Sequence, residues 1–135
     1  MEPIDTSGMA TRPVSLDSLT HQRDTGHGTV YITLTYPTKE VLNDGLTYWV
    51  VDYAHPIEVF IAISKAEPCT KAWAEGIARL ASLALRRGSN PQEVAKQLNA
   101  INCGHVLVGQ SQSVMDTLAK VLMEVSDERE TSSHD

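Results

Sequence analysis

The sequence predicts an α+β domain, with an antiparallel sheet of three to four strands followed by two to three helices packed on one face. Three observations predict it. Residues 57–63 alternate apolar side chains as a central strand does, an amphipathic pattern with clear ends follows over residues 70–87, and strand-like stretches precede both at 29–36 and 46–53. Strands first and helices after is the order typical of this class.

The first strand is expected over residues 29–36, TVYITLTY, where β-branched and apolar residues alternate as on a sheet with one buried face. The connector 37–45 is expected to turn tightly at Asn43-Asp44-Gly45 and to include a short helix over residues 39–42. No strand is expected before this stretch.

The second strand is expected over residues 46–53, LTYWVVDY. Only three residues separate it from Ile57, so we expect it to form an antiparallel hairpin with the central strand.

The long helix is expected to begin at Thr70, whose hydroxyl suits an N-cap, and to end at Gly88, which tolerates the left-handed conformation. Apolar residues at steps of four, three and four predict the stripe that faces the core. Its members are Trp73, Ile77, Leu80 and Ala84, and Ala81 and Leu85 widen it.

Two further helices carry capping signals. Asn90 and Pro91 suit the start of the second, which buries Val94, Leu98 and Ile101. Ser113 and Asp116 form a capping box for the third. A short strand is expected between them over residues 105–108.

Composition and charge bound the domain organisation. We expect a flexible arm over residues 1–23, one α+β domain over 24–126 and a disordered acidic tail over 127–135. The net charge is −6, and residues 24–123 hold only eight of the eleven Lys and Arg, which argues against DNA or RNA as a partner. No apolar run is long enough for a membrane span, so we expect a cytoplasmic protein with reduced thiols at Cys69 and Cys103.

Several stretches together resemble the TSCPD domain found at the C-terminus of adenosylcobalamin-dependent (class II) ribonucleotide reductases. They are PIEVFIAISKA, RLASLALRRG, the short second helix, Ile101 to Cys103, and SVMDTLAKVL, and they cover roughly residues 28–122. The family pattern continues after Cys103 with a proline or a further cysteine, whereas here Gly104 and His105 follow. The resemblance implies an association with nucleotide chemistry.

Basic residues give the leading candidate site. Arg86 and Arg87 end the long helix, and Lys65, Lys71 and Arg79 belong to the same set. Guanidinium groups match phosphate geometry, so the set predicts phosphate or pyrophosphate binding. The alternative is that the arginines only balance the helix dipole.

The loop VGQSQS, residues 108–113, is the second candidate. Gly109, Ser111 and Ser113 offer backbone amides just before a helix, an arrangement that accepts anions. The loop lacks the lysine of a P-loop, and the alternative is an ordinary capped helix start.

Two further sets carry weaker signals. Cys103 and His105, with His55 or Cys69, have the donor types of a tetrahedral metal site, although a packed thiol and a solvent-facing histidine explain them better. Glu58 has the position of a general base, but a glutamate paired with Lys or Arg is the commoner arrangement. We therefore expect no metal, no cofactor and no catalytic residue.

The function expected is non-catalytic binding of a nucleotide or a nucleotide-derived small molecule by a homo-oligomer. The size and layout are also similar to the phage Thoeris anti-defence proteins, sponges that sequester cyclic nucleotide or ADP-ribose-derived immune signals, which would act in the host cytoplasm. The alternative is an accessory domain that associates with a ribonucleotide reductase catalytic chain. We expect subunits to meet on the uncovered face of the sheet, through Tyr31, Thr33, Phe60 and Trp49.

Overall fold

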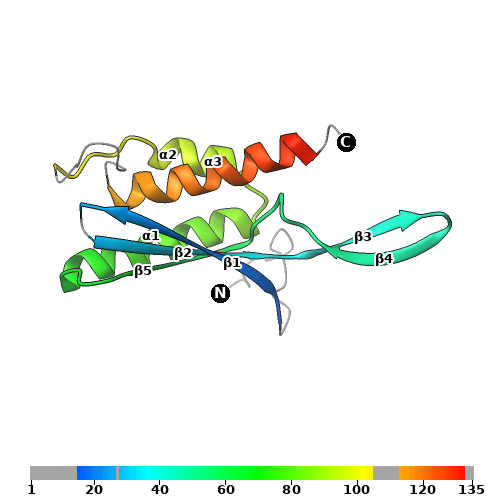
Figure 1. The fold of residues 1–135 in the computed structure, drawn as a ribbon, viewed down its shortest axis with the longest axis horizontal. Helices are drawn as coiled ribbons and strands as arrows, with labels where there is room; N and C mark the ends of the chain where they lie inside the picture. Colours follow the sequence, from blue (N-terminus) through cyan, green and yellow to red (C-terminus); the bar gives the residue numbers. More distant parts are fainter. Residues whose placement is uncertain (1–14, 27, 105–112, 133–135) are drawn as a thin grey trace, which may run out of the picture.

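The computed structural model describes residues 15–26, 28–104 and 113–132, with side chains up to Val125. The strands are β1 (Asp17–Thr25), β2 (Gly28–Tyr36), β3 (Thr38–Asn43), β4 (Leu46–Val51) and β5 (Glu58–Ile63). The helices are α1 (Pro68–Arg86), α2 (Pro91–Leu98) and α3 (Val114–Ser132). The expected α+β class is confirmed, and Figure 1 shows the three helices on one side of the sheet. None of the described helices is long and apolar enough to cross a membrane.

The main sheet has the order β1-β2-β5, with both pairs antiparallel. Val30, Ile32 and Leu34 of the central strand β2 point towards the helices and are fully buried. Gly28 begins β2 with φ of 107°, and a Cβ there would lie 2.8 Å from the Ser64 carbonyl oxygen. Only glycine therefore fits this close turn between β1 and β2.

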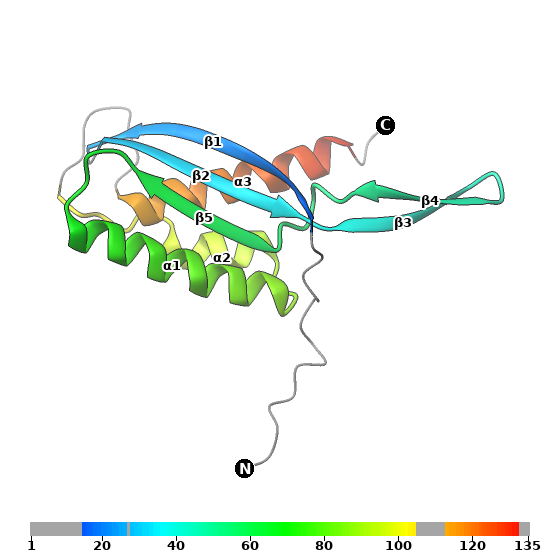
Figure 2. The ribbon, with the colours of Figure 1, turned by 90° about the horizontal axis from the view of Figure 1, so that it is seen from below.

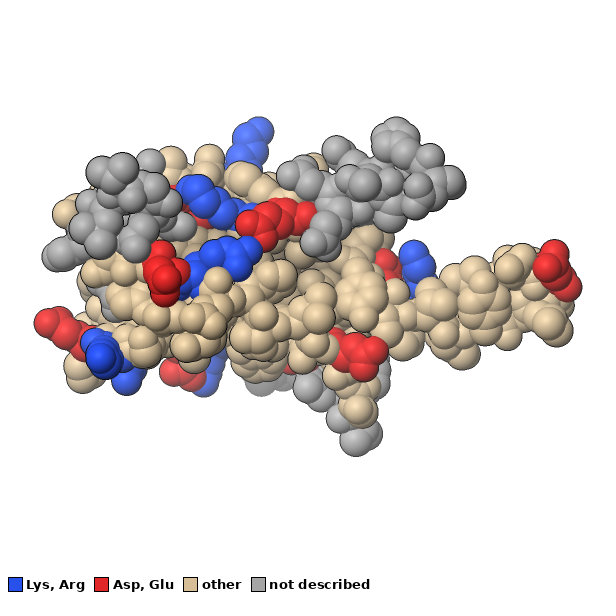
Figure 3. Space-filling view, in the orientation of Figure 1, with Lys and Arg blue, Asp and Glu red and all other residues tan. Residues whose placement is uncertain are grey.

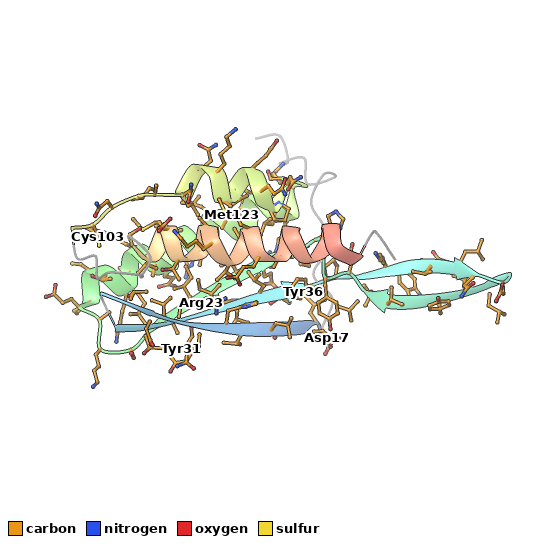
Figure 4. The ribbon with its side chains drawn as sticks, turned by 45° about the horizontal axis from the view of Figure 1, so that its top comes forward. Asp17, Arg23, Tyr31, Tyr36, Cys103 and Met123 are labelled. Carbon is orange, nitrogen blue, oxygen red and sulfur yellow. The ribbon has the colours of Figure 1, made fainter. Side chains whose placement is uncertain are left out.

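The strand β1 corrects the expected flexible arm over residues 1–23, because residues 17–23 belong to the sheet. The sequence pattern did not predict this strand because its side chains are mostly polar, and an edge strand needs only one partly covered face. Arg23 reaches α3 and donates to Glu124 over 2.6 Å, and Figure 4 shows its side chain between β1 and α3. At the other end, α3 runs to Ser132, so the expected tail boundary at 127 is also wrong.

Residues 38–51 form a separate two-stranded sheet, β3-β4, that projects from the body (Figures 1 and 2). The expected short helix over 39–42 and the expected pairing of 46–53 with the central strand are both wrong. Asp44 and Gly45 have φ of 52° and 77°, as in the two-residue hairpin turns that match strand twist. The tight turn was expected, and its consequence is that β4 pairs with the residues just before it, from Thr38↔Val51 to Asn43↔Leu46.

The long helix α1 differs from expectation in its start and in its buried face. It begins at Pro68 with Glu67 as N-cap, so Thr70 lies in the first turn. Its buried residues are Ala74, Ala78, Ala81 and Leu85. Ala81 and Leu85 were expected at the edge of the buried stripe, whereas its expected members Trp73 and Leu80 are 69% and 68% exposed. Small side chains let α1 approach β5 closely, and this close packing outweighs the burial of the larger ones.

The capping predictions for the other two helices are confirmed. The Asn90 side chain accepts from the Gln92 amide with Pro91 in the first turn, and the Ser113 hydroxyl accepts from the Asp116 amide over 3.0 Å. The Asp116 carboxylate accepts from the Ala100 amide over 2.8 Å, which ties the start of α3 to the end of α2. Expected strand 105–108 lies outside the described residues.

Candidate functional site

A groove of about 390 Å³ lies between the edge strand β5 and helix α1. Residues 58–61 form one wall, and one side of α1 forms the other. The α1 side chains that line it are Glu75, Ala78, Arg79, Ser82, Leu83 and Arg86. Two arginines of the predicted basic set therefore share a single groove.

The groove exists because β5 is an edge strand. Ser64 donates to Thr29 of β2, so alternation along the ladder turns the backbone groups of Val59, Ile61 and Ile63 to the open side. Ser82 of α1 satisfies the first of these: its hydroxyl accepts from the Val59 amide over 2.8 Å and lies 3.2 Å from the Val59 carbonyl oxygen. α1 thus covers the edge at Val59 and leaves the groove open beyond it.

Arg86 anchors one end of the groove. It donates to Glu58 over 2.6 Å, and the Glu58 side chain is only 6% exposed. Glu58 is therefore paired with an arginine, as expected for a glutamate on a strand face. Arg86 forms this ion pair in addition to balancing the helix dipole. Its Nε is buried, and no described residue accepts a hydrogen bond from it. The guanidinium therefore keeps a donor that Glu58 does not use.

Arg79 lies two turns earlier on α1 and faces the same groove. It donates to Glu75 over 2.6 Å, but both side chains are largely exposed. Exposed pairs of this spacing contribute only about 0.3–0.5 kcal/mol, so Arg79 can exchange Glu75 for another acceptor at little cost. Phe60 lines the β5 wall and is 52% exposed, and its register opposite Thr33 places its ring on the uncovered face of the sheet, at the rim of the groove.

A second hollow of about 330 Å³ continues along the same strand edge, lined by Ile61, Ala62, Ile63, Lys71, Ala74 and Glu75. Ile61 and Glu75 line both hollows. Lys71 thus lies further along the same side of the molecule as Arg79 and Arg86. Arg86, Arg79 and Lys71 thus follow one another along β5, with Glu75 lining both hollows.

The remaining predicted residues do not join this groove. Lys65 is exposed in the turn after β5, with φ of 59°, and Arg87 is exposed at the C-cap of α1. Ser113 is buried and caps α3, which is the ordinary capped helix start given above as the alternative to an anion site. Gly109 and Ser111 lie outside the described residues.

The cysteine and histidine candidates do not assemble in the described part of the chain. Cys69 and Cys103 are both exposed, and His105 lies outside the described residues. Residues 15–26, 28–104 and 113–125 include no group of three His, Cys, Asp or Glu placed to hold a metal ion. Figure 4 shows Cys103 in the connection that follows α2.

Sequence reasoning missed Ser82 and Glu75 as parts of the groove. Glu75 and Arg79 are spaced i, i+4, a signal that places them on one helix face. Ser82 sits among apolar residues in the middle of a helix, where a serine commonly bonds the carbonyl four residues earlier, as it does here to Ala78. Its additional bond to Val59 carries no signal in the sequence.

Comparison with known proteins gives one match. The family model of the TSCPD domain matches residues 6–126, which includes every strand and most of the helical layer. Neither the curated proteins nor the solved structures include a match to this chain. Because the family model covers most of the sequence, the chain belongs to the TSCPD domain family.

Proposed function

We propose that the protein binds a nucleotide or a nucleotide-derived small molecule in the β5–α1 groove and does not transform it. The observation that carries this proposal is the presence of Arg79 and Arg86 in one groove, with the half-exposed Phe60 at the rim of its β5 wall. The volume of about 390 Å³ falls in the range of small-molecule sites.

The phosphate part of such a ligand fits the Arg79 end of the site. The groove contains two acids and two arginines, so it has no excess charge, and binding requires Arg79 to leave Glu75. A charge-assisted contact to phosphate contributes about 1.5–3 kcal/mol, whereas the exposed pair contributes well under 1 kcal/mol. The exchange is therefore favourable.

The base or ring part fits the β5 wall. Phe60 offers a face for stacking, which contributes about 1–3 kcal/mol for a nucleobase. The open-side amide and carbonyl of Ile61 offer a donor and an acceptor beside it. A planar ring with polar edges matches both features.

Sequestration is the mode of action we propose for this binding. A phage-type sponge for cyclic nucleotide or ADP-ribose-derived immune signals, acting in the cytoplasm, needs tight binding of a phosphate-bearing ligand and no chemistry. The groove supports binding of that class.

Membership of the TSCPD family favours a second function: an accessory domain that associates with an adenosylcobalamin-dependent ribonucleotide reductase. On this account the groove presents a regulatory nucleotide to the catalytic chain or is not used at all. The two functions differ in whether the isolated protein retains its ligand and in whether a reductase chain binds it.

Mass spectrometry of small molecules released by heat from natively purified protein tests the proposal. We expect a phosphate-bearing nucleotide derivative at near-stoichiometric amount, and its loss from Arg79→Ala. Protein that carries no such molecule and forms a stable complex with a ribonucleotide reductase catalytic chain would favour the second function instead.

A further inference from the structure

The hollow beside Lys71 continues the β5–α1 groove towards the start of α1. Its volume is about 330 Å³, and it shares Ile61 and Glu75 with the groove. The small, buried side chain of Ala74 leaves room for it beside the strand edge. Figure 2 shows α1 running beside β5 in the opposite direction, so the start of α1 lies near the end of β5. The groove and the hollow therefore form one strip along the edge of the sheet.

Lys71 gives the hollow a positive charge. Figure 3 shows basic side chains at the end of the molecule where α1 begins. Among the residues that the structure describes, no carboxylate forms an ion pair with the Lys71 ammonium group. Glu75 lies four residues further along α1, but it pairs with Arg79, and an acid that precedes its base by four residues is the more favourable order in a helix. Lys71 therefore remains available to a ligand.

The end of β5 gives the hollow a second hydrogen-bond donor. Alternation along the ladder turns the backbone amide of Ile63 to the open side of the strand, as it does that of Ile61. Ile63 and Lys71 line the same hollow. A phosphate there would accept from an ammonium group and from a backbone amide, and both are donors that proteins commonly use to hold phosphate oxygens.

Glu75 decides which anions Lys71 and Arg79 can bind together. The three residues follow one another at steps of four, so they lie in one row of α1, and Lys71 and Arg79 are roughly 12 Å apart along the helix axis. A phosphate midway between the two cations would face the Glu75 carboxylate, whereas phosphates on either side of it would each meet one cation. The two phosphoryl groups of a pyrophosphate share an oxygen atom, so they lie too close together to straddle the carboxylate. Phosphates that a sugar separates lie far enough apart.

We infer that the ligand of this strip is a dinucleotide, linear or cyclic, whose two phosphates bind at Arg79 and at Lys71. The inference rests on the proposed function and names its ligand class. The first phosphate replaces Glu75 at Arg79, and the second accepts from Lys71 and from the Ile63 amide. Glu75 is largely exposed, so its carboxylate turns to solvent. ADP-ribose derivatives fit this arrangement less well, because their two phosphates form a pyrophosphate.

Isothermal titration calorimetry at low ionic strength, where exposed charges are least screened, tests the second phosphate position. The probes are matched pairs for each base: a dinucleoside monophosphate, and the same molecule with an added 5′-phosphate. For a base that the wild type binds, we expect the added phosphate to tighten binding about ten-fold. Lys71→Ala should abolish this gain and leave the affinity for the dinucleoside monophosphate unchanged. Lys65→Ala is the matched control, because it removes the same charge from the turn outside the strip, and it should keep the gain.

Nucleoside monophosphates and diphosphates of the same base complete the comparison. The diphosphate should bind about as tightly as the monophosphate, because its second phosphate does not reach Lys71. The inference is overturned if the 5′-phosphate adds no affinity, if Lys71→Ala retains the gain, or if the diphosphate gains as much as the dinucleotide. Binding of the monophosphate that Arg79→Ala weakens would in each of these cases leave the proposed function standing. A wild type that binds none of the probes would overturn both.

Discussion

Arg86 and Glu58 form the contact that joins the end of α1 to the start of β5, at 2.6 Å and with the carboxylate almost out of solvent. The pair fixes the depth of the groove at one end. Its burial also means that Arg86 has a structural role in addition to any contact with a ligand.

The first prediction concerns this pair. Arg86→Ala removes the cation beside the buried Glu58 carboxylate, and we expect it to lower the free energy of unfolding by about 3 kcal/mol. Adding Glu58→Gln should recover much of that loss, because the double variant has no buried charge at this position. Urea denaturation measures both. A loss below 1 kcal/mol for Arg86→Ala would mean that the pair does not hold the two elements together.

The second prediction concerns the hydroxyl of Ser82. Ser82→Ala removes the partner of the Val59 amide at the sheet edge, and we expect a loss of about 1–3 kcal/mol in the free energy of unfolding. Thr20→Ala is the control, because its hydroxyl bonds Thr33 on the exposed face. Equal losses of stability for Ser82→Ala and Thr20→Ala in thermal unfolding would show that the Ser82 hydroxyl is not needed to satisfy the Val59 amide.

The third prediction separates the N-terminal strand from what precedes it. Deleting residues 1–14 leaves every described element intact, and we expect a cooperative thermal transition to remain. Deleting residues 1–23 removes most of β1 and the Arg23–Glu124 pair, which uncovers one edge of β2, so the melting temperature should fall by more than 10 °C or the transition should disappear. Equal melting temperatures for the two deletion variants would show that β1 does not contribute to the folded sheet.

Much of the fold could be predicted from local patterns. The alternation in β2 and β5 and the caps at Asn90 and Ser113 are signals that neighbouring residues carry by themselves. The order of strands before helices then sufficed for the α+β class.

The errors share a different origin. β1 is a polar edge strand, and only its pairing with β2 places it in the sheet. β4 pairs with β3, which precedes it in the sequence, because the tight turn at Asp44 and Gly45 brings these two strands together. On α1, the larger apolar residues predict the buried face only where space allows them. Here close contact with β5 selects alanines, and Trp73 and Leu80 stay outside.

The candidate site was predicted in part for a related reason. The basic set contained Arg79 and Arg86, which the fold brings to one groove, but also Arg87, which points elsewhere because adjacent helical residues are turned by about 100°. Which of two adjacent arginines faces the groove depends on the phase of the helix, and the sequence pattern had that phase wrong.

Isothermal titration calorimetry with linear nucleotides, cyclic nucleotides and ADP-ribose derivatives tests the central claim most directly. For a panel member that the wild type binds, Arg79→Ala should weaken affinity by about ten- to a hundred-fold, because one charge-assisted phosphate contact contributes about 1.5–3 kcal/mol. Glu75→Gln should tighten binding, since it frees Arg79, and Arg87→Ala, with the same charge lost outside the groove, should leave affinity unchanged. Equal binding by the Arg79 and Arg87 variants, or no binding of any panel member by the wild type, would contradict a nucleotide site in the β5–α1 groove.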